Sequence, residues 1–99
     1  MTINKVLENN KITLTLEGRL DTITSPQLQE ALIPAFNEAN EIVLDFAKLA
    51  YVSSAGLRVL LMGEKTSKSA NVPMSIKNVS EEIMEVLDMT GFTDMLTIM

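Results

Sequence analysis

The sequence predicts a single α/β domain that spans residues 1–99. The domain is expected to contain a mixed β-sheet with an antiparallel N-terminal hairpin, a parallel centre and about three helices packed on it. Two segments with strand-like alternation open the chain, and short apolar runs then alternate with amphipathic helical segments. Of the 99 residues, 46% are hydrophobic and 21% are charged, which is typical of one globular domain rather than a disordered chain.

The first two strands are predicted to pair as a hairpin. Residues 2–9 alternate imperfectly, whereas residues 12–17 place Ile12, Leu14 and Leu16 on one face and polar side chains on the other. The Asn-Asn pair at positions 9 and 10 tolerates the positive φ angles of a tight turn. We therefore expect a half-buried hairpin.

The first helix is expected to begin at Ser25. Ser25 suits the N-cap position, and Pro26 suits the first helical position. Apolar side chains then recur at helical spacing at Leu28, Ala31, Leu32, Ala35 and Phe36. Pro34 removes the hydrogen bond to the Glu30 carbonyl, so it should kink or end this helix.

The middle of the chain predicts a buried strand and a second helix. Residues 42–46 form a nearly continuous apolar run, as expected of a central strand covered on both faces, and residues 48–52 are predicted to be a loop. The second helix is expected to start at Ser53 or Ser54 and to end near Lys68. Its inward side chains should be Leu57, Val59, Leu60 and Leu61.

The C-terminal third predicts a strand, a third helix and a short edge strand. Residues 74–77 alternate, Ser80 suits an N-cap, and Gly91 suits the C′ position after the helix. Residues 96–99 are expected to add the edge strand. Within the helix, Ile83, Val86 and Leu87 should face inward, and Glu81, Glu82, Glu85 and Asp88 should face outward.

Composition excludes several classes of function. The chain has 8 basic and 13 acidic residues, a net charge of −5, so it should repel nucleic acid. It has no His, Cys or Trp, which argues against an enzyme, a bound metal and a cofactor. No apolar run is long enough to insert into a membrane, and no signal-peptide pattern opens the chain. We expect a cytoplasmic, monomeric binding protein.

Ser53 and Ser54 stand where a predicted strand and loop lead into the second helix. A serine at a helix N-terminus is most simply a cap, but a cap needs only one hydroxyl. The other serine could carry a phosphate, which the helix dipole would stabilise. Gly56 in the first turn indicates a close approach, either by another part of the chain or by a partner.

Two aspartates allow structural and functional interpretations. Asp21 follows the second strand and could cap the first helix through residues 22–25, or it could orient a cation of a partner. Asp45 ends the apolar strand. A phosphoacceptor role would need a further acidic pair after the first strand, where Asn9 and Asn10 stand instead. Asp45 is therefore expected to hydrogen-bond to the loop that follows.

Several segments together resemble one family. Residues 52–60, Val-Ser-Ser-Ala-Gly-Leu-Arg-Val-Leu, resemble the signature of bacterial anti-sigma factor antagonists, which are STAS domain proteins. Residues 18–21, Gly-Arg-Leu-Asp, followed by Thr-Ser-Pro at 24–26, resemble the second motif of that family. The hairpin, residues 42–45 and residues 89–92 also match in order and spacing. The resemblance covers nearly the whole chain and implies a stand-alone STAS domain.

The resemblance implies a partner-switching mechanism. An unphosphorylated antagonist of this family binds an anti-sigma factor that is also a serine kinase of the GHKL class, and the sigma factor is released. The kinase then phosphorylates the antagonist, and a PP2C-type phosphatase reverses the modification. By motif position the acceptor is Ser54. Ser53 is the alternative acceptor because it replaces an aspartate common in the family. The implied partner contacts are Asp21, Thr22, Ser53, Ser54, Ala55, Gly56 and Arg58.

Two other functions remain open at this point. The chain could be a constitutive STAS accessory subunit of a lipid-transport ATPase complex, which would need no phosphorylation. It could also be a nucleotide-sensing module with its ligand near the start of the second helix. No glycine-rich phosphate loop supports the nucleotide-sensing alternative.

Overall fold

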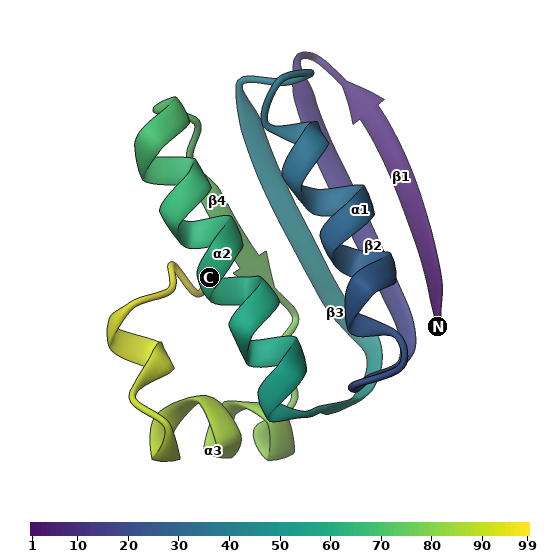
Figure 1. Ribbon diagram of the computed structural model, residues 1–99, viewed down its shortest axis with the longest axis vertical. Coiled ribbons are helices and arrows are strands. Elements are labelled where there is room, and N and C mark those ends of the chain that lie inside the picture. The colour runs from purple at the N-terminus through teal and green to yellow at the C-terminus, as the bar shows by residue number, and fades with distance from the viewer.

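The protein forms a four-stranded sheet with helices packed on one face (Figure 1). The computed structural model describes all 99 residues. The strands lie in chain order in the sheet: β1 (Thr2–Glu8), β2 (Lys11–Leu20), β3 (Glu41–Val52) and β4 (Met74–Lys77). β1 and β2 are antiparallel, and the other two pairings are parallel. The predicted mixed sheet with an N-terminal hairpin is confirmed.

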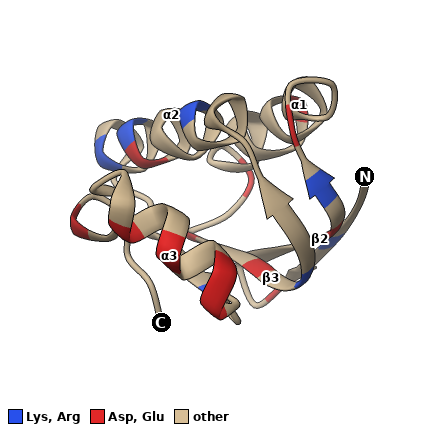
Figure 2. Ribbon diagram, turned by 90° about the horizontal axis from the view of Figure 1, so that it is seen from below, with Lys and Arg blue, Asp and Glu red and all other residues tan.

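Three helices complete the fold: α1 (Ser25–Ala35), α2 (Ser54–Ala70) and α3 (Glu81–Met89). Helices α1 and α2 lie side by side over the same face of the sheet, and α3 lies near the carboxyl end of the parallel strands, in contact with β3 (Figure 1). The view from below shows acidic bands along α3 (Figure 2). The predicted outward side chains of α3 are exposed, and Ile83 and Leu87 are buried.

Local signals in the sequence explain most element boundaries. Asn9 and Asn10 adopt φ angles of 54° and 61°, as the predicted tight turn requires. Ser80 caps α3 by accepting a hydrogen bond from the Ile83 N–H at 3.3 Å. Gly91 follows the helix with a φ of 78°. Pro34 lies inside α1, and that helix ends one residue later, as predicted.

The predicted loop at residues 48–52 is wrong, because these residues continue strand β3. Strand β3 contains two bulges relative to β2. One extra residue of β3 lies opposite the segment from Thr15 to Glu17, and another lies opposite the step from Gly18 to Arg19. Such bulges interrupt the two-residue alternation by which a strand is recognised in a sequence. The longer strand carries the chain directly to the start of α2.

The predicted start of the first helix and the predicted last strand are also corrected. Ser25 is the first residue of α1 rather than its N-cap; Thr24 occupies the N-cap position, and the Ser25 hydroxyl donates to the Asp21 carbonyl. The predicted edge strand at 96–99 is reduced to a single parallel bridge between Ile76 and Ile98. No helix has the length and apolar character needed to cross a membrane. No cluster of three or more potential metal ligands is present.

The hydrophobic core lies between the sheet and helices α1 and α2. Fully buried side chains come from both layers and include Leu14, Leu44 and Phe46 on the sheet and Leu32 and Leu60 on the helices. Burial of this apolar surface is the main stabilising contribution and fixes α2 against the sheet.

Candidate functional site at the start of helix α2

The two serines at the start of α2 have different roles. Ser53 is the N-cap: its hydroxyl oxygen accepts a hydrogen bond from the Gly56 N–H at 3.3 Å, and its carbonyl accepts one from the Leu57 N–H at 2.9 Å. Ser54 is the first residue of the helix, is exposed, and its hydroxyl has no hydrogen-bond partner within the chain. Of the two serines, Ser54 is thus the more exposed, and its hydroxyl is the one without a partner in the chain.

The end of β2 is held tightly against the first turn of α2. The Ser53 N–H donates to the Leu20 carbonyl at 2.8 Å. A Cβ atom at Gly56 would lie 2.6 Å from the Leu20 Cγ and 3.2 Å from the Leu20 carbonyl oxygen. Gly56 is buried, so close internal packing explains why glycine stands there. This contact determines where the residues after Leu20 lie relative to Ser54.

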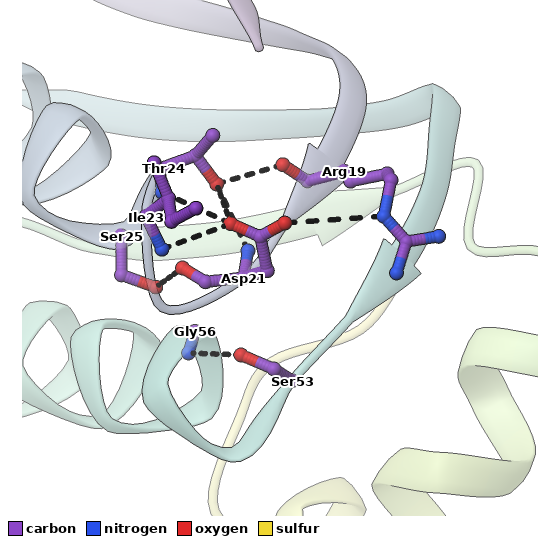
Figure 3. A network of polar contacts seen from close by, with 7 residues as sticks. All are labelled: Arg19, Asp21, Ile23, Thr24, Ser25, Ser53 and Gly56. Carbon is purple, nitrogen blue, oxygen red and sulfur yellow. Dashed lines mark hydrogen bonds and ion pairs between the residues drawn. The ribbon is translucent and has the colours of Figure 1, made fainter.

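Asp21 organises the turn between β2 and α1 (Figure 3). Its Oδ1 accepts hydrogen bonds from the Ile23 N–H at 3.0 Å and the Thr24 N–H at 3.1 Å. The Thr24 hydroxyl oxygen accepts from the Asp21 N–H at 2.9 Å and lies 2.7 Å from the Arg19 carbonyl oxygen. The Thr24 N–H, with weaker help from Ile23 and Arg19, holds the pKa of the Asp21 carboxyl below its ordinary value. Asp21 was predicted to cap the first helix; its carboxylate instead holds the turn before α1, and Thr24 at the N-cap has no side-chain cap hydrogen bond.

The other predicted contact residues surround Ser54 with different exposures. Thr22 and Arg58 are exposed, whereas Ala55 is half-buried. Arg58 follows Ser54 by four residues, so both side chains lie on the same face of α2. Arg58 takes part in none of the three ion pairs of the molecule. The exposed surface at the start of α2 thus carries a hydroxyl and an unpaired cation.

Two further residues at this end of the sheet were not predicted. The Arg19 guanidinium lies 4.2 Å from the centre of the Tyr51 ring, and its Nε lies 3.9 Å from the Asp21 Oδ2. Arg19 and Tyr51 are paired across β2 and β3, and the Tyr51 side chain is exposed. This pair was not predicted from the sequence, because Tyr51 belongs to the part of β3 that was predicted to be a loop.

Asp45 lies outside this site and has a structural role. Its Oδ1 accepts hydrogen bonds from the Ala47 N–H and from the Asn78 side-chain amide, both at 3.0 Å. Partial burial raises the pKa of Asp45, but these hydrogen bonds and the nearby lysines outweigh burial, so the net shift is downward. The predicted hydrogen bond to a following loop is replaced by bonds to Ala47 of the same strand and to Asn78, because no loop follows Asp45.

The molecule has one shallow concavity, of about 320 Å³. It lies at the β1–β2 turn, at the opposite end of β2 from Asp21. Its lining residues are Val6, Glu8, Asn9, Lys11 and Thr13. The start of α2 is instead an open surface, which suits contact with another protein better than enclosure of a small ligand.

Comparisons with known proteins agree with this fold and identify its family. The anti-sigma-B factor antagonist of Bacillus subtilis (strain 168) is 27% identical over 99% of this chain and 92% of its own length. The unphosphorylated anti-sigma factor antagonist SpoIIAA superposes with a TM-score of 0.82 at 16% identity, covering 99% of this chain and 88% of that one. The phosphorylated Bacillus SpoIIAA superposes with a TM-score of 0.77 at 16% identity, covering 99% and 91%. The family model described as "Mlab, STAS domain" matches residues 3–97, and the chain therefore belongs to the STAS domain family.

Proposed function

We propose that this protein is an anti-sigma factor antagonist that binds an anti-sigma factor kinase of the GHKL class through the surface around Ser54. The observation that carries the proposal is the division of roles between the two serines: Ser53 caps α2, and Ser54 presents an unpaired, exposed hydroxyl. The relatives named anti-sigma-B factor antagonists support the same function. Binding releases the sigma factor, and phosphorylation of Ser54 ends the interaction.

The chemistry of the chain suits the passive partner in phosphoryl transfer. The kinase supplies the catalytic groups, so the acceptor needs only an accessible hydroxyl. The chain has no His or Cys to act as a base or thiol nucleophile, which fits a binding protein rather than an enzyme. A PP2C-type phosphatase would restore the unphosphorylated form. A monomer in the cytoplasm is sufficient for this cycle, because one chain carries the whole surface.

A phosphate on Ser54 would change binding through local electrostatics. Phosphorylation adds about −1.5 to −2 charges and three acceptor oxygens at neutral pH. At the centre of an interface this charge must be desolvated, and losing a central contact costs about 2 kcal/mol or more. The exposed N–H groups of the first turn of α2 stabilise the same charge when the protein is free. The phosphate should therefore disfavour the complex without disfavouring the fold.

Phosphorylation by purified kinases tests the acceptor assignment. Each GHKL-class kinase of the host is incubated with ATP and either the wild type, Ser54→Ala or Ser53→Ala, and intact mass and peptide mapping locate the phosphate. We expect one kinase, the cognate kinase, to modify the wild type and Ser53→Ala but not Ser54→Ala. Modification of Ser54→Ala at Ser53 would keep the mechanism and overturn the assignment.

Binding measurements test the switch itself. Isothermal titration of the cognate kinase, loaded with a non-hydrolysable ATP analogue, should give a Kd at least about 30-fold weaker for Ser54→Asp than for the wild type. Ser53→Asp keeps a carboxylate cap on α2 and serves as the matched charge control. Equal affinities of the wild type and Ser54→Asp would refute the switch. If no host kinase modifies or binds the protein, the constitutive accessory subunit becomes the better hypothesis.

A further inference from the structure

Ile23 is the most solvent-exposed large hydrophobic residue of the molecule. Its exposed fraction is 88%, and Met89 at the end of α3 follows with 86%. Single exposed apolar side chains are common on protein surfaces, so exposure alone assigns no role. The position and rigidity of Ile23 distinguish it from Met89.

The turn that carries Ile23 is held by a dense set of hydrogen bonds. The Ile23 N–H itself donates to the Asp21 carboxylate, and Thr24 bonds to both sides of the turn through its N–H and hydroxyl. The Ser25 N–H donates to the Asp21 carbonyl at 2.8 Å. The backbone at Ile23 is therefore fixed before any partner binds, which lowers the entropic cost of binding there.

The same turn is placed beside the start of α2. Figure 3 shows Ile23 and Asp21 in the turn and Ser53 at the neighbouring helix start, and the Ser53 N–H is bonded to the Leu20 carbonyl. The Arg19 guanidinium, stacked on Tyr51 and close to Asp21, flanks the turn. The exposed Ile23 thus lies in a turn that adjoins the start of α2, and the Arg19 guanidinium lies on the other side of Asp21 from it (Figure 3).

We propose that Ile23 is the hydrophobic anchor that inserts into an apolar pocket of the anti-sigma factor kinase, an inference that rests on the proposed function. A β-branched isoleucine has few rotamers and loses less side-chain entropy on burial than a methionine such as Met89. The exposed Arg19 guanidinium, held near the same turn by Asp21, fits a carboxylate of the kinase beside that pocket. The network of Asp21 and Thr24 acts as the support that positions the anchor.

Substitution of Ile23, with Met89 as a matched control, tests the proposal. Titration of the cognate kinase, loaded with a non-hydrolysable ATP analogue, should give a Kd about tenfold to a hundredfold weaker for Ile23→Ser, because the burial of one isoleucine is lost. Ile23→Val should retain most of the affinity. Met89→Ser should bind as the wild type, since α3 ends on the side away from the β2–α1 turn (Figure 1).

Phosphorylation kinetics give a second readout. An anchor that supplies no group to the transfer step contributes to binding but not to phosphoryl transfer, so Ile23→Ser should raise the KM of the kinase for this protein and leave kcat unchanged. Urea unfolding of Ile23→Ser should match the wild type, because the side chain is exposed and its backbone bond is retained. This excludes unfolding as the cause of weaker binding.

The outcomes separate the anchor from the proposed function. If Ile23→Ser binds as tightly as the wild type while Ser54→Asp binds weakly, the anchor is refuted and the switch stands. If no kinase binds the wild type, both are refuted. Analytical ultracentrifugation tests whether Ile23 instead contacts a second copy of this protein. Concentration-dependent dimers of the wild type that disappear in Ile23→Ser would refute the proposal that Ile23 inserts into a pocket of the kinase.

Discussion

At the scale of single residues, Ser53 and Ser54 are chemically identical and differ only in hydrogen bonding. The Ser53 hydroxyl satisfies the Gly56 N–H, whereas the Ser54 hydroxyl faces solvent. One serine therefore stabilises the helix and the other is available for modification. This division follows from the extended backbone of Ser53, with φ −93° and ψ 173°, which directs its side chain back over the first turn.

Alanine substitutions should separate these two roles in stability. Ser53→Ala removes the cap and should lower the free energy of unfolding by about 1 kcal/mol. Ser54→Ala should leave it within about 0.5 kcal/mol of the wild type, since the exposed hydroxyl bonds to nothing in the chain. Urea unfolding followed by circular dichroism measures both. A larger loss for Ser54→Ala than for Ser53→Ala would contradict the assignment of the cap.

Asp21 should make stability depend on acid pH. The folded pKa lies below the ordinary value of 3.8, so the unfolded chain binds a proton first as the pH falls. The stabilisation is complete above the ordinary pKa and is lost as the pH falls through the lowered folded pKa. Asp21→Asn should therefore lose less stability than the wild type between about pH 5 and about pH 2.

Urea titrations of both proteins across this range measure the difference. Asp45→Asn is measured in the same way, because Asp45 is a second carboxyl group whose pKa is lowered in the folded protein. Parallel stability curves for the wild type and Asp21→Asn would show that the hydrogen bonds to Asp21 do not stabilise its charged form.

At the scale of elements, two glycines allow close approaches of α2 for different reasons. A Cβ at Gly56 would meet the branch carbon and the backbone carbonyl of Leu20, which is fully buried. A Cβ at Gly63 would meet the Cδ2 of Leu32 at 2.7 Å and the sulfur of Met74 at 3.0 Å. The neighbours of Gly63 are ends of flexible side chains, so they can move aside more easily than the neighbours of Gly56.

Alanine at these two positions should therefore have unequal effects. We expect Gly56→Ala to destabilise the protein by about 1–3 kcal/mol, because Leu20 must shift. Gly63→Ala should cost less, since the gain in helix propensity, up to about 1 kcal/mol, offsets the repacking. Thermal unfolding measures both variants. Gly56→Ala should also weaken kinase binding, because a shift of Leu20 moves the turn that contains Asp21. If the two variants are equally stable and bind the kinase equally well, the packing of Leu20 on Gly56 does not position this turn for binding.

The bulged strand β3 explains how the site is assembled at this scale. Its two extra residues relative to β2 let Tyr51 pair with Arg19 and let the chain enter α2 beside Leu20. A strand that ended at residue 46, as the apolar run suggested, would not bring Ser53 to the Leu20 carbonyl. Bulges often re-aim side chains next to functional sites.

At the scale of the whole molecule, the fold separates the charges, so that the surface near Ser54 differs in charge from the molecule as a whole. The protein has a net charge of −5, yet the exposed cations Arg19 and Arg58 lie near the end of β2 and the start of α2, where the proposed interface is. Acidic side chains gather on α3 instead (Figure 2). Local charge at the proposed interface thus differs in sign from the net charge, which favours approach of an acidic partner surface.

Phosphorylation of Ser54 should leave the fold intact. The helix dipole and the unpaired N–H groups at the start of α2 favour an anion, and Arg58 lies one turn away. We expect the thermal midpoint of the phosphorylated protein to equal or exceed that of the unphosphorylated protein, with the same circular dichroism spectrum. The phosphatase-treated sample is the control. A substantial decrease in the midpoint would mean that the switch acts through unfolding.

The sequence by itself determined the class of fold and most elements, because helix periodicity, strand alternation, the Asn9-Asn10 turn and the Ser80 cap depend on neighbours along the chain. It also indicated a candidate site around the serine pair, Asp21 and their neighbours in the two motifs. The residue pattern alone did not show which serine caps the helix, although the family resemblance favoured Ser54 as the acceptor, and Tyr51 was misplaced in a loop. The exposure of Ile23 could not be read from a local pattern.

Only the tertiary structure decided how these residues lie relative to one another, because that depends on contacts between elements distant in the chain. Leu20 packs on Gly56, the Leu20 carbonyl binds the Ser53 N–H, and the β2–β3 register pairs Arg19 with Tyr51. These contacts form only when the parallel strands are aligned and α2 is packed on them. Local sequence determines which elements form, and packing between elements determines which side chains remain free to meet a partner.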